Sequence, residues 1–258
     1  MYPRLLLLFV LLWCNPASAS PLIAYTEELP PLNFLQHDKV SGFSSELLQA
    51  MADKAAIPLS LQLLPWARGY AMTQSTPGSL LFSTVRTPER ENLFRWVGPI
   101  SPRRIYLYRL TRRKDIQLRN IEQLKQLRTS TLFESATQKR LLELGLRIGE
   151  EQDSGRSDAV NLGKLLLGRV DLVAMLDWAM AWQLQQSGQD AHLVQAVALL
   201  DGDSQYWYAL NRQTPEETVR RLQAALNALE TSGYAERLRQ KYMGRDKAPA
   251  HIADFTLH

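Results

Sequence analysis

The sequence predicts an α/β fold built on parallel strands. Short apolar segments with the pattern of strands occur between segments whose apolar residues have the three-and-four spacing of amphipathic helices. A strand, a helix and a second strand in succession imply a crossover connection, which joins parallel strands. The chain has 258 residues, 45% of them hydrophobic, which is enough for one large unit or two small units with buried cores.

Residues 1–19 are expected to be an export signal and not part of the fold. A positively charged start precedes the apolar run from Leu5 to Trp13, and Ala17-Ser-Ala19 offers small residues for cleavage. This run is much shorter than the roughly 20 apolar residues that a membrane-spanning helix needs. In the alternative, Cys14 would be a lipid-anchored first residue, but the bulky Trp13 before it favours cleavage after Ala19.

The mature chain would then have no cysteine and a formal net charge of +3, because Arg4 and Cys14 are removed with the signal. Export without disulfides is typical of a bacterial periplasmic protein, so we expect a soluble protein of that compartment. The basic residues are scattered and form no stripe, which argues against a nucleic-acid partner. The four histidines lack metal-ligand spacing, so the sequence predicts no metal site.

The first half of the mature chain contains three predicted strands and one clear helix. The strand at 21–25 ends at an acidic, proline-rich turn, where open α/β sheets place ligand contacts. Leu47, Leu48 and Met51 lie on one face of a helix that begins at Ser44, for which Ser44 and Ser45 offer a cap. The other two strands are expected at 59–64 and 79–83.

A second α/β series is predicted after residue 104, followed by two closing helices. Thr214 is expected to cap the first of these, with Pro215 in its first turn and Glu217 completing a capping box. Gly233 is expected to end that helix before a last one that reaches Tyr242. The series consists of an extended segment at 105–110, helices around 121–127 and 137–144, and strands at 129–133, 170–175 and 206–210.

Several short motifs in a fixed order carry a resemblance to a known family. They are Pro30-Pro-Leu-Asn-Phe34, Gly42-Phe43 with Glu46-Leu47, Thr87-Pro-Glu-Arg90 followed by Phe94 and Gly98-Pro99, Gly168-Arg-Val-Asp171, and Gly233-Tyr234 with Lys241-Tyr242-Met-Gly244. The ordered set spans about residues 22 to 244. It resembles family 3 of the bacterial periplasmic solute-binding proteins, the amino-acid receptors of ABC importers.

The resemblance implies a two-lobed, type 2 periplasmic binding fold. Each lobe would be a mostly parallel sheet flanked by helices, and the chain would cross the hinge twice, leaving a ligand cleft between the lobes. Lobe one would combine 20–103 with 203–245, lobe two would comprise 104–202, and 246–258 would be a tail. The protein would be a monomer that binds a small carboxylate-bearing solute, needs no cofactor, performs no covalent chemistry and delivers the solute to a membrane permease.

By the resemblance, Arg90 grips the carboxylate of the ligand. A planar guanidinium suits this role because it can donate two parallel hydrogen bonds to a carboxylate. The alternative is a surface arginine paired with Glu89 or Glu91. Arg86, four residues earlier, would either serve a second carboxylate of a diacid ligand or brace the loop.

Two further pairs of residues follow predicted strands of the first lobe. Ser83 and Thr84 lie at a strand end where the family places hydroxyl and backbone groups around the ligand carboxylate, although hydroxyls also cap ordinary turns. Trp66 and Arg68 follow the strand at 59–64 and precede a helix. The tryptophan would be an aromatic wall of the pocket or a core residue.

The second lobe would contribute Ser135 and Thr137, at a helix start whose N–H groups favour an anion, unless they are only a cap. Asp177 would bind the ligand ammonium, but the slot that the family uses holds Leu176. Glu27 or Glu28 in the first turn could supply the acidic partner instead.

Trp178 and Trp182 lie four residues apart and are expected to share a helical face that packs in a core. Two other functions stay open at this point. A free-standing sensor module would use the same cleft to report a ligand to a partner. A periplasmic dehydratase-like enzyme on the same fold would need a general acid or base, for which Glu27, Glu28 and Asp177 are the candidates in the cleft.

Overall fold

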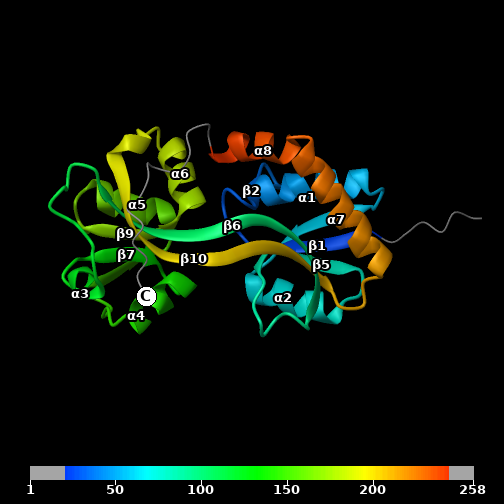
Figure 1. Cartoon of the computed structure of the whole chain (residues 1–258), viewed down its shortest axis with the longest axis horizontal. Helices are drawn as coiled ribbons and strands as arrows, with labels where there is room; N and C mark the ends of the chain where they lie inside the picture. The colour runs from blue at the N-terminus through cyan, green and yellow to red at the C-terminus, as the bar shows by residue number, and fades with distance from the viewer. Residues whose placement is uncertain (1–20, 244–258) are drawn as a thin grey trace, which may run out of the picture.

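A computed structural model describes residues 21–243, so the expected export signal at 1–19 and the tail at 246–258 lie outside the described residues. Figure 1 shows two bodies joined by the long strands β6 (Phe94–Leu110) and β10 (Val194–Asn211), which run through both. These strands pair antiparallel along most of their length. Between residues 21 and 243, no helix is long and apolar enough to cross a membrane.

A single sheet of eight strands passes through both bodies in the order β4-β1-β5-β10-β6-β9-β7-β8. In the first body, β1 (Leu22–Thr26) pairs parallel with β4 (Leu59–Leu63) and β5 (Ser79–Val85). In the second body, β7 (Thr129–Leu132) pairs parallel with β8 (Gln152–Gly155) and β9 (Leu172–Leu176). The predicted α/β class with parallel strands is therefore confirmed. A separate hairpin is formed by β2 (Phe34–Gln36) and β3 (Lys39–Ser41).

The helices cover the two halves of this sheet as two sets (Figure 1). The first body carries α1 (Phe43–Lys54), α2 (Trp66–Ser75), α7 (Glu216–Thr231) and α8 (Tyr234–Met243). The second carries α3 (Ile121–Leu124), α4 (Ala136–Glu143), α5 (Asp158–Leu166), α6 (Asp177–Gln186) and the 3-10 turn η1 (Ala191–Leu193). No local sequence pattern had predicted the hairpin, β8 or the full length of β6 and β10.

Two predicted helix caps are wrong. Helix α1 has Gly42 at its N-cap, and the N–H groups of Phe43 and Ser44 donate to backbone carbonyls of residues 31 and 32, so no serine cap is needed. Helix α7 has Pro215 at its N-cap, one residue later than the predicted capping box requires. The Thr214 side chain is buried, and its hydroxyl has no hydrogen-bond partner in the described part of the chain.

Trp178 and Trp182 pack in a core, as predicted, but the core belongs mainly to the other body. The Trp178 ring lies 5.2 Å from that of Phe43, and the Trp182 ring lies 5.3 Å from that of Phe34 and 6.3 Å from that of Tyr242. These partners come from the first body, whereas both tryptophans belong to α6 of the second. The second body's own apolar side chains form two further clusters.

Candidate functional site

The candidate site is formed where parallel strands end. Glu27 follows β1, Trp66 follows β4, and Ser83 lies near the end of β5, so all three come to the same edge of the sheet. In the second body, Ser135 follows β7 and Asp177 follows β9. The carboxyl ends of parallel strands are the usual ligand-binding edge of an open α/β sheet.

Arg90 lies on aromatic side chains of α2. Its guanidinium carbon is 4.9 Å from the ring centre of Trp66 and 5.6 Å from that of Tyr70, and Nη1 donates to the Val85 carbonyl at 3.1 Å. The side chain is half-buried and forms no ion pair with any carboxylate of residues 21–243. The structure therefore shows no ion pair of Arg90 with Glu89 or Glu91. The guanidinium is held in place while most of its hydrogen-bond donors stay unused.

Arg86 forms an ion pair with Glu91 of its own loop. Its Nε donates to Glu91 at 2.7 Å, and its guanidinium lies over the rings of Trp207 and Trp96, at 4.7 and 5.6 Å. The Glu91 carboxylate raises the pKa of Arg86 by hydrogen bonding. Of the two roles left open for Arg86, this geometry favours bracing the loop that carries Arg90.

Ser83 and Thr84 have different environments. Ser83 has a positive φ of 56°, and its hydroxyl donates to the Asn33 side chain, which in turn donates to the Glu27 carbonyl at 2.6 Å. These bonds link the end of β5 to the turn after β1. Thr84 is fully buried, and its hydroxyl has no hydrogen-bond partner among the described residues.

Glu27, in the turn after β1, has a perturbed carboxyl group. Burial raises the pKa of its carboxyl to about 7, because the charged form is poorly solvated. Glu28 is exposed, and its carboxylate accepts the Leu35 N–H at 3.3 Å. Of the two acidic alternatives to Asp177, Glu27 is therefore the more buried.

The carboxylate of Asp177 already interacts with other groups of the protein. Its carboxylate is 4% exposed, pairs with Nε of Arg104 at 3.1 Å and accepts the Trp178 N–H at 2.9 Å. Burial raises its pKa to about 6, against the opposing effect of Arg104. The helix begins at Asp177, directly after Leu176, so the carboxylate bonds to the first turn of its own helix and to β6.

Tyr206 on β10 is buried and is influenced by acidic residues of both bodies. Burial raises the pKa of its hydroxyl to about 12, Arg103 lowers it, and the charges of Glu27 and Asp177 raise it further. Glu27 and Asp177 come from different bodies, yet both act on this one hydroxyl. Arg103 also pairs with Asp201 across the two long strands.

The sequence analysis missed Tyr206, Tyr70 and the Arg103–Asp201 pair. Tyr70 had a weak signal, because it lies four residues after Trp66 and therefore on the same helical face. The other residues lie within the long strands that join the two bodies. Their proximity depends on the pairing register of these strands, which no local pattern shows.

The remaining predicted residues lie at helix starts. Ser135 is the N-cap of α4: its hydroxyl accepts the Gln138 N–H at 3.1 Å and donates to the Leu132 carbonyl at 2.7 Å. Thr137, in the first turn, is half-buried. Trp66 begins α2 and stacks on Tyr70 with ring centres 4.9 Å apart, whereas Arg68 is exposed on that helix.

Comparison with known protein families gives one match, to the bacterial extracellular solute-binding proteins, family 3, over residues 22–245. This chain belongs to that family. The family match covers both bodies and every predicted site residue, so the resemblance carried by the short motifs is confirmed. No curated protein sequence matches the chain.

Solved structures of type 2 periplasmic binding proteins share the fold. Substrate-binding domain 2 of Lactococcus lactis GlnP, in an open conformation, is 17% identical over 87% of this chain and 95% of its own, with a TM-score of 0.68. The arginine-, lysine- and histidine-binding protein ArtJ of Geobacillus stearothermophilus is 18% identical over 88% and 96%, at 0.64. A histidine kinase sensor domain similar to periplasmic binding proteins is 19% identical over 87% and 96%, at 0.65.

Proposed function

We propose that this solute-binding protein captures a small carboxylate-bearing solute, an amino acid or a close relative, in a cleft between its two bodies. The observation that carries the proposal is Arg90, a fixed guanidinium at the binding edge of the sheet that has no carboxylate partner within residues 21–243. A ligand carboxylate would complete its hydrogen bonding. The name of one similar structure, an arginine-, lysine- and histidine-binding protein, supports this solute class.

The other contacts would divide between the two bodies. Trp66 would form an aromatic wall beside the bound carboxylate, and Ser83 would contribute polar atoms from the end of β5. Ser135 and Thr137 would approach from the helix start of the second body. Glu27 is the better candidate for a ligand ammonium, because Asp177 already pairs with Arg104.

In this proposal the protein acts in the periplasm as a monomer, and closure of the bodies around the solute creates the form that an ABC permease recognises. Ligand binding favours closure only through contacts that are better in the closed form. The lobe bounds of 20–103 with 203–245 and 104–202 stay part of the proposal.

A thermal-shift screen tests the solute class. Amino acids, dicarboxylates, polyamines and short peptides would be added at high concentration, since a ligand at 100 times its Kd stabilises the folded state by about 2.7 kcal/mol. Arg90→Ala should remove the shift and weaken binding by about 10- to 100-fold, as expected for a charge-assisted pair. Arg169→Ala, an exposed arginine of the second body, is the matched control. Unchanged binding by Arg90→Ala would refute the assignment.

A sensor role is the second candidate, because a histidine kinase sensor domain is among the similar structures. The cleft would bind the same solute, and closure would be read by a signalling partner in place of a permease. Measuring uptake of the solute in cells with and without this protein distinguishes the two roles: uptake that depends on the protein supports import, and unchanged uptake supports sensing.

A further inference from the structure

A pocket lies in the second body, at the junction where β6 ends and β10 begins. Its volume is about 510 Å³, within the range of small-molecule sites, and it is open to solvent. The apolar part of its lining includes Leu110, Leu166 and Leu193, the last 41% exposed. The polar part includes Arg112, Lys114 and His192. None of these residues belongs to the candidate site described above.

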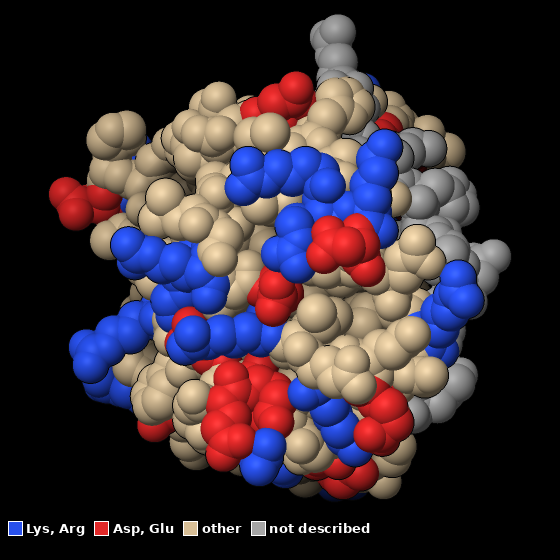
Figure 2. All heavy atoms as spheres, turned by 90° about the vertical axis from the view of Figure 1, so that its left-hand side faces the viewer, with Lys and Arg blue, Asp and Glu red and all other residues tan. Residues whose placement is uncertain are grey.

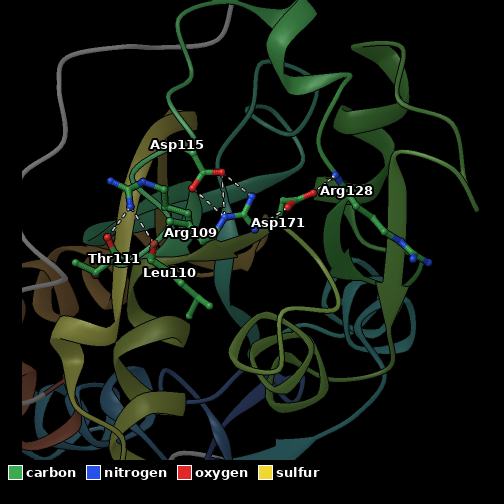
Figure 3. A network of polar contacts seen from close by, with 7 residues as sticks. Arg109, Leu110, Thr111, Asp115, Arg128 and Asp171 are labelled. Atoms are coloured by element: carbon green, nitrogen blue, oxygen red, sulfur yellow. Dashed lines mark hydrogen bonds and ion pairs between the residues drawn. The ribbon is translucent and has the colours of Figure 1, made fainter.

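The walls of this pocket are tied together by hydrogen bonds. The Thr111 N–H donates to the Leu193 carbonyl at 2.9 Å, and its hydroxyl donates to the His192 carbonyl at 2.6 Å. Behind them, Arg109 donates to the carbonyls of Leu110 and Thr111, both at 2.9 Å (Figure 3). The pocket is therefore built from segments whose relative position is held by the backbone.

The acidic groups near the pocket already form ion pairs or hydrogen bonds with other residues. Asp115 and Asp171 both pair with Arg113, at 2.8 and 3.1 Å, and Asp171 also accepts the Arg128 N–H (Figure 3). Asp190, two residues before His192, accepts the backbone N–H of that residue at 2.8 Å and does not line the pocket.

Two cations of the pocket lining consequently have no carboxylate partner among the described residues. Arg112 and Lys114 form no ion pair and no side-chain hydrogen bond within residues 21–243, although Arg113 between them forms two ion pairs. Arg109 is 8% exposed and donates only to neutral oxygens, and its Nε has no partner among the described residues. Figure 2 views this body end-on and shows lysine and arginine side chains interspersed with aspartate and glutamate and with uncharged surface.

We propose that this pocket binds a small amphiphilic carboxylate, an anionic head with an apolar chain of about six to ten carbons. The leucines would cover the chain, and Arg112 and Lys114 would bind the head, so that the ligand supplies the negative charge that the pocket lacks. The inference is independent of the proposed cleft ligand.

The experiment measures binding of hexanoate, octanoate and decanoate by isothermal titration calorimetry, below their micelle concentrations. The full chain carries Arg90→Ala, so that the carboxylate clamp of the cleft does not contribute. We expect one site, with affinity rising by up to about fourfold for each added methylene. Acetate, octanol and octylamine should bind at least about tenfold more weakly than octanoate, because each lacks either the chain or the negative head.

Variants locate the site. Arg112→Gln with Lys114→Gln should weaken octanoate binding by about 10- to 100-fold, and Leu193→Asp should abolish it. The matched control, Lys139→Gln with Arg156→Gln, removes the same charge from exposed positions of the same body and should leave binding unchanged. Absence of octanoate binding, an equal loss in the control pair, or affinity independent of chain length would each overturn the proposal. Binding in the Arg90→Ala background supports it whatever the cleft is found to bind.

Discussion

Removing the indole of Trp182 should shift this protein toward an open arrangement of its two bodies. Trp182 projects from α6 of the second body and contacts Phe34 and Tyr242 of the first, at ring distances of 5.3 and 6.3 Å. Opening on this side would separate these rings, whereas the paired strands β6 and β10 would stay intact. Trp182→Ala therefore acts on the contact between the bodies.

The size of the effect follows from the two ring contacts. An aromatic pair contributes about 0.5–1.5 kcal/mol beyond the area that it buries, so two pairs contribute about 1–3 kcal/mol. Loss of that amount from the closed form alone would lower the closing equilibrium constant by roughly 5- to 150-fold. The apparent Kd of the cleft ligand rises by the same factor where the open form already predominates.

Two spectroscopic labels, one on each body, would report the distance between the bodies with and without ligand. Trp182→Ala should lengthen the mean distance in the ligand-free protein and weaken ligand binding, and Trp182→Phe should fall between the variant and the original chain. Leu167→Ala, at a position 68% exposed in the second body, is the control for a general loss of apolar surface. Unchanged distance and unchanged affinity in Trp182→Ala would refute the reasoning.

Three other predictions concern stability and are checked by urea unfolding. Glu27 has a raised pKa of about 7, so its contribution to stability is fully present below the unfolded value near 4.5 and is lost as the pH rises through 7. Glu27→Gln should therefore gain about 1–3 kcal/mol relative to the original chain between pH 5 and pH 8, and a constant difference would contradict the raised pKa. Gly42→Ala should lose about 1–3 kcal/mol or more, because φ is 112° and a Cβ would lie 2.5 Å from the Leu32 carbonyl oxygen. Gly163→Ala, inside α5 with open space around it, should instead gain about 0.5–1 kcal/mol, and the reverse order would refute the strain argument. Ser135→Ala should lose about 1 kcal/mol with its cap, Ser135→Asp should retain it, and equal stability of all three chains would show that the cap contributes nothing.

Local patterns predicted most strands and helices because each depends on neighbouring residues. Apolar alternation located β4, and the three-and-four spacing located α1. The caps of α1 and α7 were not predictable in this way. At α1, carbonyls from the preceding turn satisfy the first N–H groups, and that turn folds against the helix only in the tertiary structure.

The candidate site was predicted unevenly for the same reason. Arg90, Trp66 and Ser83 follow strands that pair in parallel, so their common edge could be inferred from the order of elements. The ion pairs of Asp177 with Arg104 and of Arg86 with Glu91 depend on which side chains approach each other in space.

The sequence by itself determined the fold class and the family and indicated Arg90 as a candidate site residue. Motifs and apolar periodicity involve residues that are close together in the chain, so they can be recognised without the tertiary structure. Only the tertiary structure decided which charges are free. Partners such as Arg104 and Asp177 are 73 residues apart in the chain, and the strand register brings them within hydrogen-bond distance. A charge is available to a ligand only where this pairing leaves it without an oppositely charged partner, as it does at Arg90 and Arg112 among the described residues.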